Sequence, residues 1–300
     1  MLAKLVPAPL VRTFARPYLA GVHAASALET AARLYERDGR LTTLDLLGEA
    51  VTVPEQVEKN ERTYLEVVEL VAGDSRFAHA PHRPSISIKP SAFTAGAREE
   101  AFVPIRRIVE RARELRVAVT IDMEDHPWTD PTLEHAIRLY EEGFDVGTVL
   151  QSRLHRTGAD LERIPEGMRV RLVIGIYPEP AEIALTDKKQ MKLRLLDLAK
   201  RLLERGGRVE LGTHDDAVVE RYLAEVVPAA PERCELQILL GVPREKLLSR
   251  LAAGELGPII PVRIYVPFAT DMNEATAYLR RRLAESPNMA WLVLRNLLGD

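Results

Sequence analysis

The run VAVTIDM at residues 117–123 is rich in β-branched and aliphatic residues and then reaches a charged side chain, Asp122. Seven other runs of this kind occur from about Leu41 onward, and helix-like segments separate them. They read LTTLDLLG (41–48), SISIK (85–89), FDVGTVLQ (144–151), RVRLVIG (169–175), RVELGTH (208–214), ELQILLG (235–241) and PVRIYVP (261–267). Strands that alternate with helices pair in parallel. Eight such units in about 260 residues predict a closed (β/α)8 barrel.

A barrel of this kind places its chemistry at the C-terminal ends of its strands. The residues at those ends are Asp45, Lys89, Asp122, Gln151, Tyr177, His214, Gln237 and Tyr265. Capping of the following helices is an alternative for Asp122, Thr213 and Asp215, because such side chains often accept from backbone N–H groups. Capping alone is a poor explanation for a lysine, a histidine, glutamines and tyrosines at the same end.

The bulk composition favours one large α/β domain. The chain has 300 residues, 46% of them hydrophobic, and a net charge of −3, which argues against a nucleic-acid footprint. The single cysteine, Cys234, excludes an intramolecular disulfide and fits a reducing compartment. Neither a secretory signal nor an apolar run long enough to span a bilayer is evident. We therefore expect a cytoplasmic enzyme.

Along the chain we expect a helical segment at residues 1–40 that packs on the barrel, and the (β/α)8 barrel itself at 41–300. The two form one structural domain. Pro54 suits the first turn of the first barrel helix, which runs to about Gly73. Further helices are predicted at 98–115, 130–142, 187–205, 215–226, 243–253 and 273–285, with a short one near 158–164. Residues 74–84 read as a loop.

The chain lacks the glycine-rich phosphate loops GxGxxG and GxxxxGK[ST], and it lacks HExxH. The run Thr213-His214-Asp215-Asp216 contains metal-ligand types, but a lone strand-end histidine is more often a hydrogen-bonding group, so we predict no metal site. Lys89 admits two interpretations. It is either an imine-forming lysine or a fixed positive charge for an anionic substrate or for Asp122.

The segment YLRRRLAE at 278–285 follows the last strand and has helical character. Arg281 and Glu285 are spaced to meet on a helix face, and neighbouring arginines can converge on a carboxylate. An ordinary solvated helix with weak Arg–Glu pairs is the alternative, and the spacing alone favours it.

Taken together, the residues resemble the bacterial monofunctional proline dehydrogenases, an FAD-dependent family with a distorted (β/α)8 barrel. The resemblance runs in order over nearly the whole chain. It rests on LDLLGE (44–49), SIK (87–89), IDMED (121–125), VLQS (149–152), RLV (171–173) with Gly175 and Tyr177, THD (213–215), YVP (265–267) and the Tyr-Leu-x-Arg-Arg-x-x-Glu signature from 278 to 285.

The resemblance implies that Lys89, Arg281 and Arg282 hold the carboxylate of L-proline. It also implies that Asp122, Tyr265 and Tyr278 shape the substrate pocket. An arginine in the place of Arg171 lies by the flavin N5 edge. The other cofactor-binding residues that it implies are Gln151, Gly175, Tyr177, Thr213, His214, Gln237 and Glu285.

The implied reaction is hydride transfer from L-proline to flavin N5, which yields 1-pyrroline-5-carboxylate in the first step of proline catabolism. A quinone-type electron acceptor, a functional link to a pyrroline-5-carboxylate dehydrogenase and peripheral contact with the inner membrane are implied as well; oligomeric state is not. The last helix is expected to cap the barrel mouth, and the N-terminal helix to fill the place that it vacates.

Two positions depart from the family pattern. Ile174 stands where the family usually has a lysine, so a positive charge expected beside the flavin is missing. After the last strand, the usual Tyr-Gly becomes Phe268-Ala269, and residues 270–277 also differ. Alternatives are therefore a flavoenzyme for another small cyclic or secondary amino acid, a Lys89 Schiff-base lyase, or a ligand-binding paralogue without activity.

Overall fold

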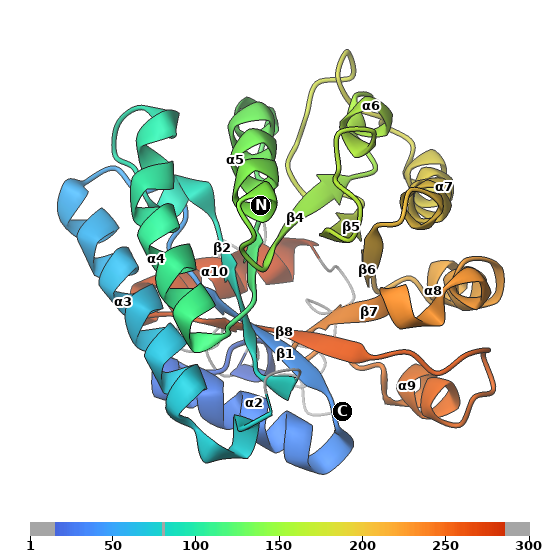
Figure 1. Cartoon of the computed structure of the whole chain (residues 1–300), viewed down its shortest axis with the longest axis horizontal. Coiled ribbons are helices and arrows are strands. Elements are labelled where there is room, and N and C mark those ends of the chain that lie inside the picture. The colour runs from blue at the N-terminus through green and yellow to red at the C-terminus, as the bar shows by residue number, and fades with distance from the viewer. Residues whose placement is uncertain (1–15, 80–81, 286–300) are drawn as a thin grey trace, which may run out of the picture.

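The computed structural model describes residues 16–79 and 82–285, and its centre is a closed barrel of eight parallel strands (Figure 1). Each strand pairs with the next in sequence, and β8 closes the barrel on β1. All eight predicted strands are confirmed. They are β1 (Leu41–Leu46), β2 (Ser85–Ile88), β3 (Val119–Ile121), β4 (Val146–Gln151), β5 (Arg169–Val173), β6 (Arg208–Gly212), β7 (Cys234–Leu239) and β8 (Val262–Phe268).

Helices surround the strands, and the predicted helical segments are confirmed to within a few residues. They are α2 (Ala24–Asp38), α3 (Pro54–Gly73), α4 (Phe102–Leu115), α5 (Thr129–Glu141), the short α6 (Thr157–Leu161), α7 (Lys188–Glu204), α8 (Asp216–Glu225), α9 (Glu245–Ala252) and α10 (Met272–Glu285). The segment 74–84, expected to be a loop, contains one turn of 3-10 helix, η3 (Ser75–Phe77), which Asp74 caps by accepting from the backbone N–H of Arg76.

The strands form because β-branched and aliphatic residues dominate them, and because the outer helices and the barrel interior cover both of their faces. Ile86, Ile121 and Leu172 on β2, β3 and β5 are fully buried. They belong to one hydrophobic core that extends under the ring of helices. The parallel register then brings the C-terminal ends of all eight strands to the same end of the barrel.

The helix α2 packs against β1, β8 and α3 on the outside of the barrel, where it completes the ring between α3 and α9 (Figure 1). Its buried face includes Ala27, Leu28 and Ala31. It ends at Gly39, whose φ of 64° is the left-handed conformation that glycine adopts without strain. The expected place of the N-terminal helix is thus confirmed. The division of the chain at residue 40 stays a prediction, and residues 1–15 lie outside the described residues.

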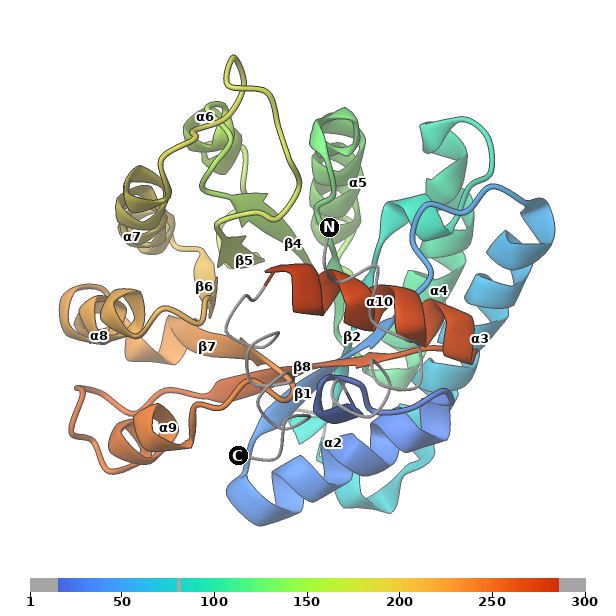
Figure 2. The ribbon, with the colours of Figure 1, turned by 180° about the vertical axis from the view of Figure 1, so that it is seen from behind.

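The last helix, α10, crosses the open end of the barrel instead of packing beside it (Figure 2). Its start is capped: the Asp271 carboxylate accepts from the backbone N–H groups of Asn273 (2.7 Å) and Glu274 (3.0 Å). Ala275, Tyr278 and Leu279 form a small apolar cluster that is separate from the main core, together with Leu47 and Ala269. The predicted cap over the barrel mouth is confirmed.

Within the described part of the chain, no helix combines the length and the apolar character that crossing a bilayer requires.

Candidate active site

All eight strand-end residues predicted from the sequence line one cavity beneath α10: Asp45, Lys89, Asp122, Gln151, Tyr177, His214, Gln237 and Tyr265. Arg171, Gly175 and Tyr278 line the same cavity, together with apolar side chains such as Val149 and Val173. The strand topology brings these side chains together, because each stands at or near the C-terminal end of its strand.

Lys89 lies between two carboxylates and a tyrosine hydroxyl that come from β1, from the end of β3 and from β8. Its ammonium group binds the carboxylate of Asp45 and donates to the Tyr265 hydroxyl at 3.2 Å. The Tyr265 hydroxyl in turn donates to Asp122 Oδ2 at 2.8 Å, and that oxygen lies 3.8 Å from Lys89 Nζ. This arrangement holds a positive charge in the cavity by means of two carboxylates and a phenol.

The ionisation of this group follows from burial and from charge. Burial lowers the pKa of Lys89, but Asp45, Tyr265 and Asp122 together raise it well above its usual value. Burial raises the pKa of Asp45 to about 6, although the charge of Lys89 opposes that shift. Lys89 is therefore a charged lysine at neutral pH. Because a protonated amine is no nucleophile, this argues against the Schiff-base interpretation.

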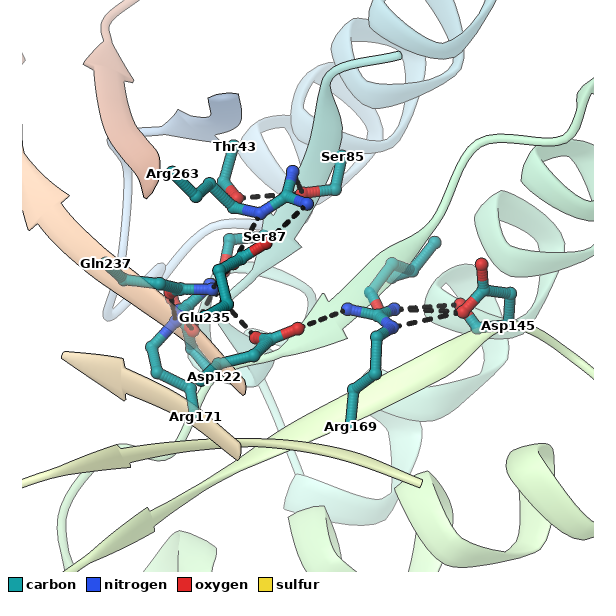
Figure 3. A network of polar contacts seen from close by, with 12 residues as sticks. Thr43, Ser85, Ser87, Asp122, Asp145, Arg169, Arg171, Glu235, Gln237 and Arg263 are labelled. Carbon is teal, nitrogen blue, oxygen red and sulfur yellow. Dashed lines mark hydrogen bonds and ion pairs between the residues drawn. The ribbon is translucent and has the colours of Figure 1, made fainter. Parts of the chain in front are cut away.

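Arg171 extends from β5 into the barrel and is 6% exposed. Its Nη1 donates to Asp122 Oδ1 (2.5 Å) and to Ser87 Oγ (3.2 Å), and its Nε donates to Gln237 Oε1 (2.5 Å) (Figure 3). Its remaining nitrogen, Nη2, is buried and has no hydrogen-bond partner among the described residues. Arg171 is one of the side chains that line the cavity, so the unpaired donor belongs to a residue of the cavity wall.

Gln151, at the end of β4, leaves a matching acceptor. Its Nε2 donates to the backbone oxygen of Glu124 at 2.7 Å, whereas its buried Oε1 lacks a partner within the described residues. Gly175 lies directly against this oxygen with a φ of 100°, so a side chain at that position would be strained and would collide with Gln151.

The run at 213–216 has local structural roles. Thr213 Oγ1 accepts from the backbone N–H of Asp215 (3.3 Å), and Asp215 caps α8 by accepting from Val218 (3.0 Å). The alternative that these side chains satisfy backbone donors is thus confirmed for Thr213 and Asp215, but not for Asp122, whose carboxylate binds side chains. His214 Nε2 accepts from the backbone N–H of Leu239 at 2.9 Å. In the described ranges, no three His, Cys, Asp and Glu side chains gather closely enough to hold a metal ion.

The arginine pair is placed only in part. Arg281, Arg282 and Glu285 belong to α10, but their side chains lie outside the described residues. Tyr278, one turn earlier on the same helix, lines the cavity. The helix that carries the pair is therefore at the mouth of the site.

Ile174 requires a correction. We expected its position to lie beside the flavin, but Val173, Gly175, Ile176 and Tyr177 line the cavity and Ile174 packs against the main hydrophobic core. The alternation of side chains along an extended chain explains this, because Arg171 and Val173 already face inward. The isoleucine side chain itself thus lies outside the cavity lining, and the effect of the missing lysine on the flavin stays a prediction.

One carboxyl group of the cavity wall, and one buried directly behind it, were not predicted from the sequence. Glu49 lines the cavity, and Glu124 is 4% exposed and accepts from the backbone N–H (2.7 Å) and hydroxyl (2.5 Å) of Ser91. Burial raises the pKa of Glu124 to about 7, against the opposing effect of these bonds. A usable signal was its place two residues after Asp122, on the loop that leaves the same strand end.

At the C-terminal ends of its strands, the closed barrel carries charged side chains and hydrogen-bonding groups that have no partner in the described part of the chain. This arrangement is that of a (β/α)8-barrel enzyme. Comparison with known proteins identifies its family. The model of the family described as Proline dehydrogenase matches residues 27–291, and the chain belongs to this family.

Two curated relatives agree over almost their full lengths. The chain is 32% identical to a proline dehydrogenase of Deinococcus radiodurans over 294 residues, which is 95% of this chain and 90% of that one. It is 31% identical to proline dehydrogenase 1 of Bacillus subtilis over 303 residues, 99% and 95% of the two chains.

Among solved structures, proline utilization A (PutA) from Bdellovibrio bacteriovorus, inactivated by N-propargylglycine, superposes with a TM-score of 0.76 at 23% identity. The match covers 90% of this chain and 32% of that chain, so this protein spans about a third of its length. At this identity the likeness concerns the fold.

Proline dehydrogenases are FAD-dependent, and the cavity can be tested against that cofactor. The edge of an isoalloxazine ring carries both acceptors and an N–H donor, and its faces are apolar. The cavity offers the unpaired donor Arg171 Nη2, the unpaired acceptor Gln151 Oε1 and apolar walls. A buried polar atom without a hydrogen-bond partner destabilises a folded protein, so such atoms are rare unless a ligand binds them. The residues present therefore fit a flavin edge.

Proposed function

We propose that this protein is an FAD-dependent proline dehydrogenase that oxidises L-proline to 1-pyrroline-5-carboxylate. Family membership over nearly the whole chain supports the proposal. The observation that carries it is the cavity wall, where a lysine held charged by carboxylates stands with an unpaired arginine nitrogen and an unpaired glutamine oxygen. The charged lysine suits the carboxylate of an amino acid, and the arginine nitrogen and the glutamine oxygen suit a flavin edge.

Substrate binding is assigned to the cations. Lys89 would exchange part of its interaction with Asp45 for the carboxylate of proline, and Arg281 and Arg282 would close on that carboxylate from α10. Holding the carboxylate fixes the position in the cavity of the reacting carbon, which is the ring carbon next to the nitrogen that does not carry the carboxylate. Asp122, Tyr265 and Tyr278 would shape the pocket around the ring. Because α10 covers the mouth, water is kept from the reacting atoms.

The cofactor would be held by the remaining site residues: Gln151, Arg171, Gly175, Tyr177, Thr213, His214, Gln237 and Glu285. FAD, when bound, supplies the hydride acceptor. Proline loses a hydride from the ring carbon and a proton from the nitrogen, and a carbon–nitrogen double bond forms. The charge of Arg171 lies where it would stabilise negative charge at the flavin edge.

Three further features rest on the sequence resemblance. We propose a quinone-type electron acceptor, a functional link to a pyrroline-5-carboxylate dehydrogenase, and a cytoplasmic location with peripheral contact at the inner membrane. We also keep the proposal that residues 1–40 form a helical segment packed on the 41–300 barrel.

Steady-state turnover with a short-chain quinone as acceptor tests the substrate. Purified holoenzyme is incubated with L-proline, D-proline, the six-membered analogue pipecolate and the open-chain analogue sarcosine, and the products are identified by mass spectrometry. L-proline should have the highest kcat/KM and give a product that is lighter by two hydrogen atoms. A clear preference for another secondary amino acid would contradict the proposed substrate.

A further inference from the structure

Beneath the cavity, two carboxylates hold the amide group of Gln237. Glu210 on β6 and Glu235 on β7 each accept a hydrogen bond from Gln237 Nε2, and both distances are 2.8 Å. An amide nitrogen has two hydrogens, so both are used. The amide oxygen of Gln237 therefore points away from the two carboxylates and can accept a hydrogen bond from another donor.

On the side of this oxygen lies Arg171, whose Nε donates to Gln237 Oε1 at 2.5 Å (Figure 3). A flipped amide would set its NH2 group against the guanidinium and its oxygen against two carboxylates. Arg171, Glu210 and Gln237 are only 4–6% exposed, so water cannot relieve such mismatches. The two carboxylates thus allow one orientation of the amide.

The orientation of Gln237 then constrains Arg171. The guanidinium group is planar, and its Nε and Nη1 are bound by Gln237 and by Asp122 with Ser87. With two of its nitrogens fixed, the direction of the third is fixed too. That third nitrogen, Nη2, is the buried donor without a partner among the described residues.

We infer that Glu210 and Glu235 are positioning residues, which aim the free nitrogen of Arg171 at the bound cofactor by fixing the amide of Gln237. The inference rests on the proposed function, since it takes a flavin to be the molecule in the cavity. Neither carboxylate touches the cavity: both act through Gln237.

The network offers both a variant and a control. In Glu210→Gln, Arg169 loses one of its two ion-pair partners but keeps Asp145 at 3.1 Å. The new amide has one acceptor oxygen for two donors, Arg169 and Gln237, so the orientation of Gln237 is no longer enforced. Asp145→Asn also removes a carboxylate from Arg169, but Asp145 is exposed and does not contact Gln237.

A double-mutant cycle on the holoenzyme tests the inference. Glu210→Gln, Gln237→Met and the double variant are compared for kcat and KM with L-proline, and for the midpoint potential of the bound flavin. Glu210→Gln should lower kcat by about tenfold, leave KM within about twofold and shift the potential. In the Gln237→Met background, the same change should have no further effect. Asp145→Asn should match the wild type in every measurement.

Several outcomes would overturn the inference. If the potential shift of Glu210→Gln persists in the Gln237→Met background, Glu210 acts through space and not through the amide. If Glu210→Gln lowers only Tm, its role is structural. Should Glu210→Gln not fold, Gln237→Met alone must lower kcat with KM held, and unchanged kinetics would refute the positioning chain. Failure of wild-type flavin to be reduced by L-proline would instead refute the proposed function.

Discussion

At the level of single residues, Lys89 is the group on which substrate binding depends most. Carboxylates of two neighbouring strands keep it charged, and Tyr265 fixes its direction. The same carboxylates would repel the anionic end of an amino acid if the lysine were absent. The positive charge therefore both attracts the substrate and neutralises the acids around it.

Replacement of Lys89 by Met should lower kcat/KM for L-proline by about 30- to 150-fold, which corresponds to the ~2–3 kcal/mol of a charge-assisted bond. Lys89→Arg, which keeps the charge, is the matched control and should lose less. Borohydride treatment in the presence of a keto acid should leave Lys89 unmodified. A trapped adduct at this residue would restore the Schiff-base interpretation.

Burial of Glu124 makes the stability of the protein depend on pH. Its pKa is about 7 in the folded protein and about 4.3 when unfolded. The folded state thus binds the extra proton between these values, and the free energy of unfolding falls as pH rises through this window. Glu124→Gln keeps the shape without the charge.

Relative to Glu124→Gln, the wild type should lose about 2–3 kcal/mol of stability between pH 4.5 and pH 8, with no further loss above that. Urea unfolding of both proteins at a series of pH values measures this difference. A difference that is constant with pH would mean that folding does not raise the pKa of Glu124.

The sequence allowed the residues at strand ends to be predicted, since position along a parallel strand determines which end of the barrel a residue reaches. Glu210 and Glu235 could not be predicted in this way, because they lie within strands. Their importance comes from the register of β6 with β7, which places the two acids side by side, and from Arg169 and Arg263, which offset them. Such pairing between distant segments is not visible in a local pattern.

At the level of secondary-structure elements, α10 is the part that converts a barrel into a closed site. It lies across the strand ends (Figure 2). It also contributes Tyr278 to the cavity lining. Periodicity predicted this helix but not its place, which came only from the family resemblance. The reason is physical: the apolar face of a helix does not specify whether it packs beside the barrel or over its mouth.

If α10 brings the arginine pair to the substrate, Arg281→Met and Arg282→Met should each raise KM for L-proline steeply. The increase corresponds to a loss of ~2–4 kcal/mol of charge-assisted hydrogen bonding to the substrate carboxylate. Flavin content should be retained, because the cofactor wall is untouched. Titration of proline against each variant, with bound flavin measured by absorbance, provides the check. Unchanged kinetics in both would favour the ordinary solvated helix.

The end of β5 provides a second test at this level. Because Ile174 is half-buried against the core and does not line the cavity, Ile174→Lys should place a charge against apolar side chains and lower Tm, with FAD bound no more tightly than in the wild type. Ile176→Lys is the control for adding a lysine to this segment. Ile176 is 56% exposed and lines the cavity, so a lysine there is not placed against the core. Tighter FAD binding in Ile174→Lys would show that the side chain at 174 reaches the cofactor.

At the level of the whole molecule, the barrel brings together groups that are more than two hundred residues apart in sequence, as Asp45 and Tyr265 are. The alternation of strands and helices made the architecture predictable, and α2 takes the outer position that α10 leaves (Figure 1). The buried charges are balanced locally from strand to strand, so the site is held by the same interior that holds the fold.

The central claim is that a flavin bound at the strand ends accepts a hydride from L-proline. Anaerobic absorption spectroscopy of the purified holoenzyme tests it most directly. The protein should show a flavin band at about 450 nm, and L-proline should bleach that band without any other electron acceptor. A colourless protein after loading with FAD, or a flavin band that L-proline leaves unchanged, would contradict the account.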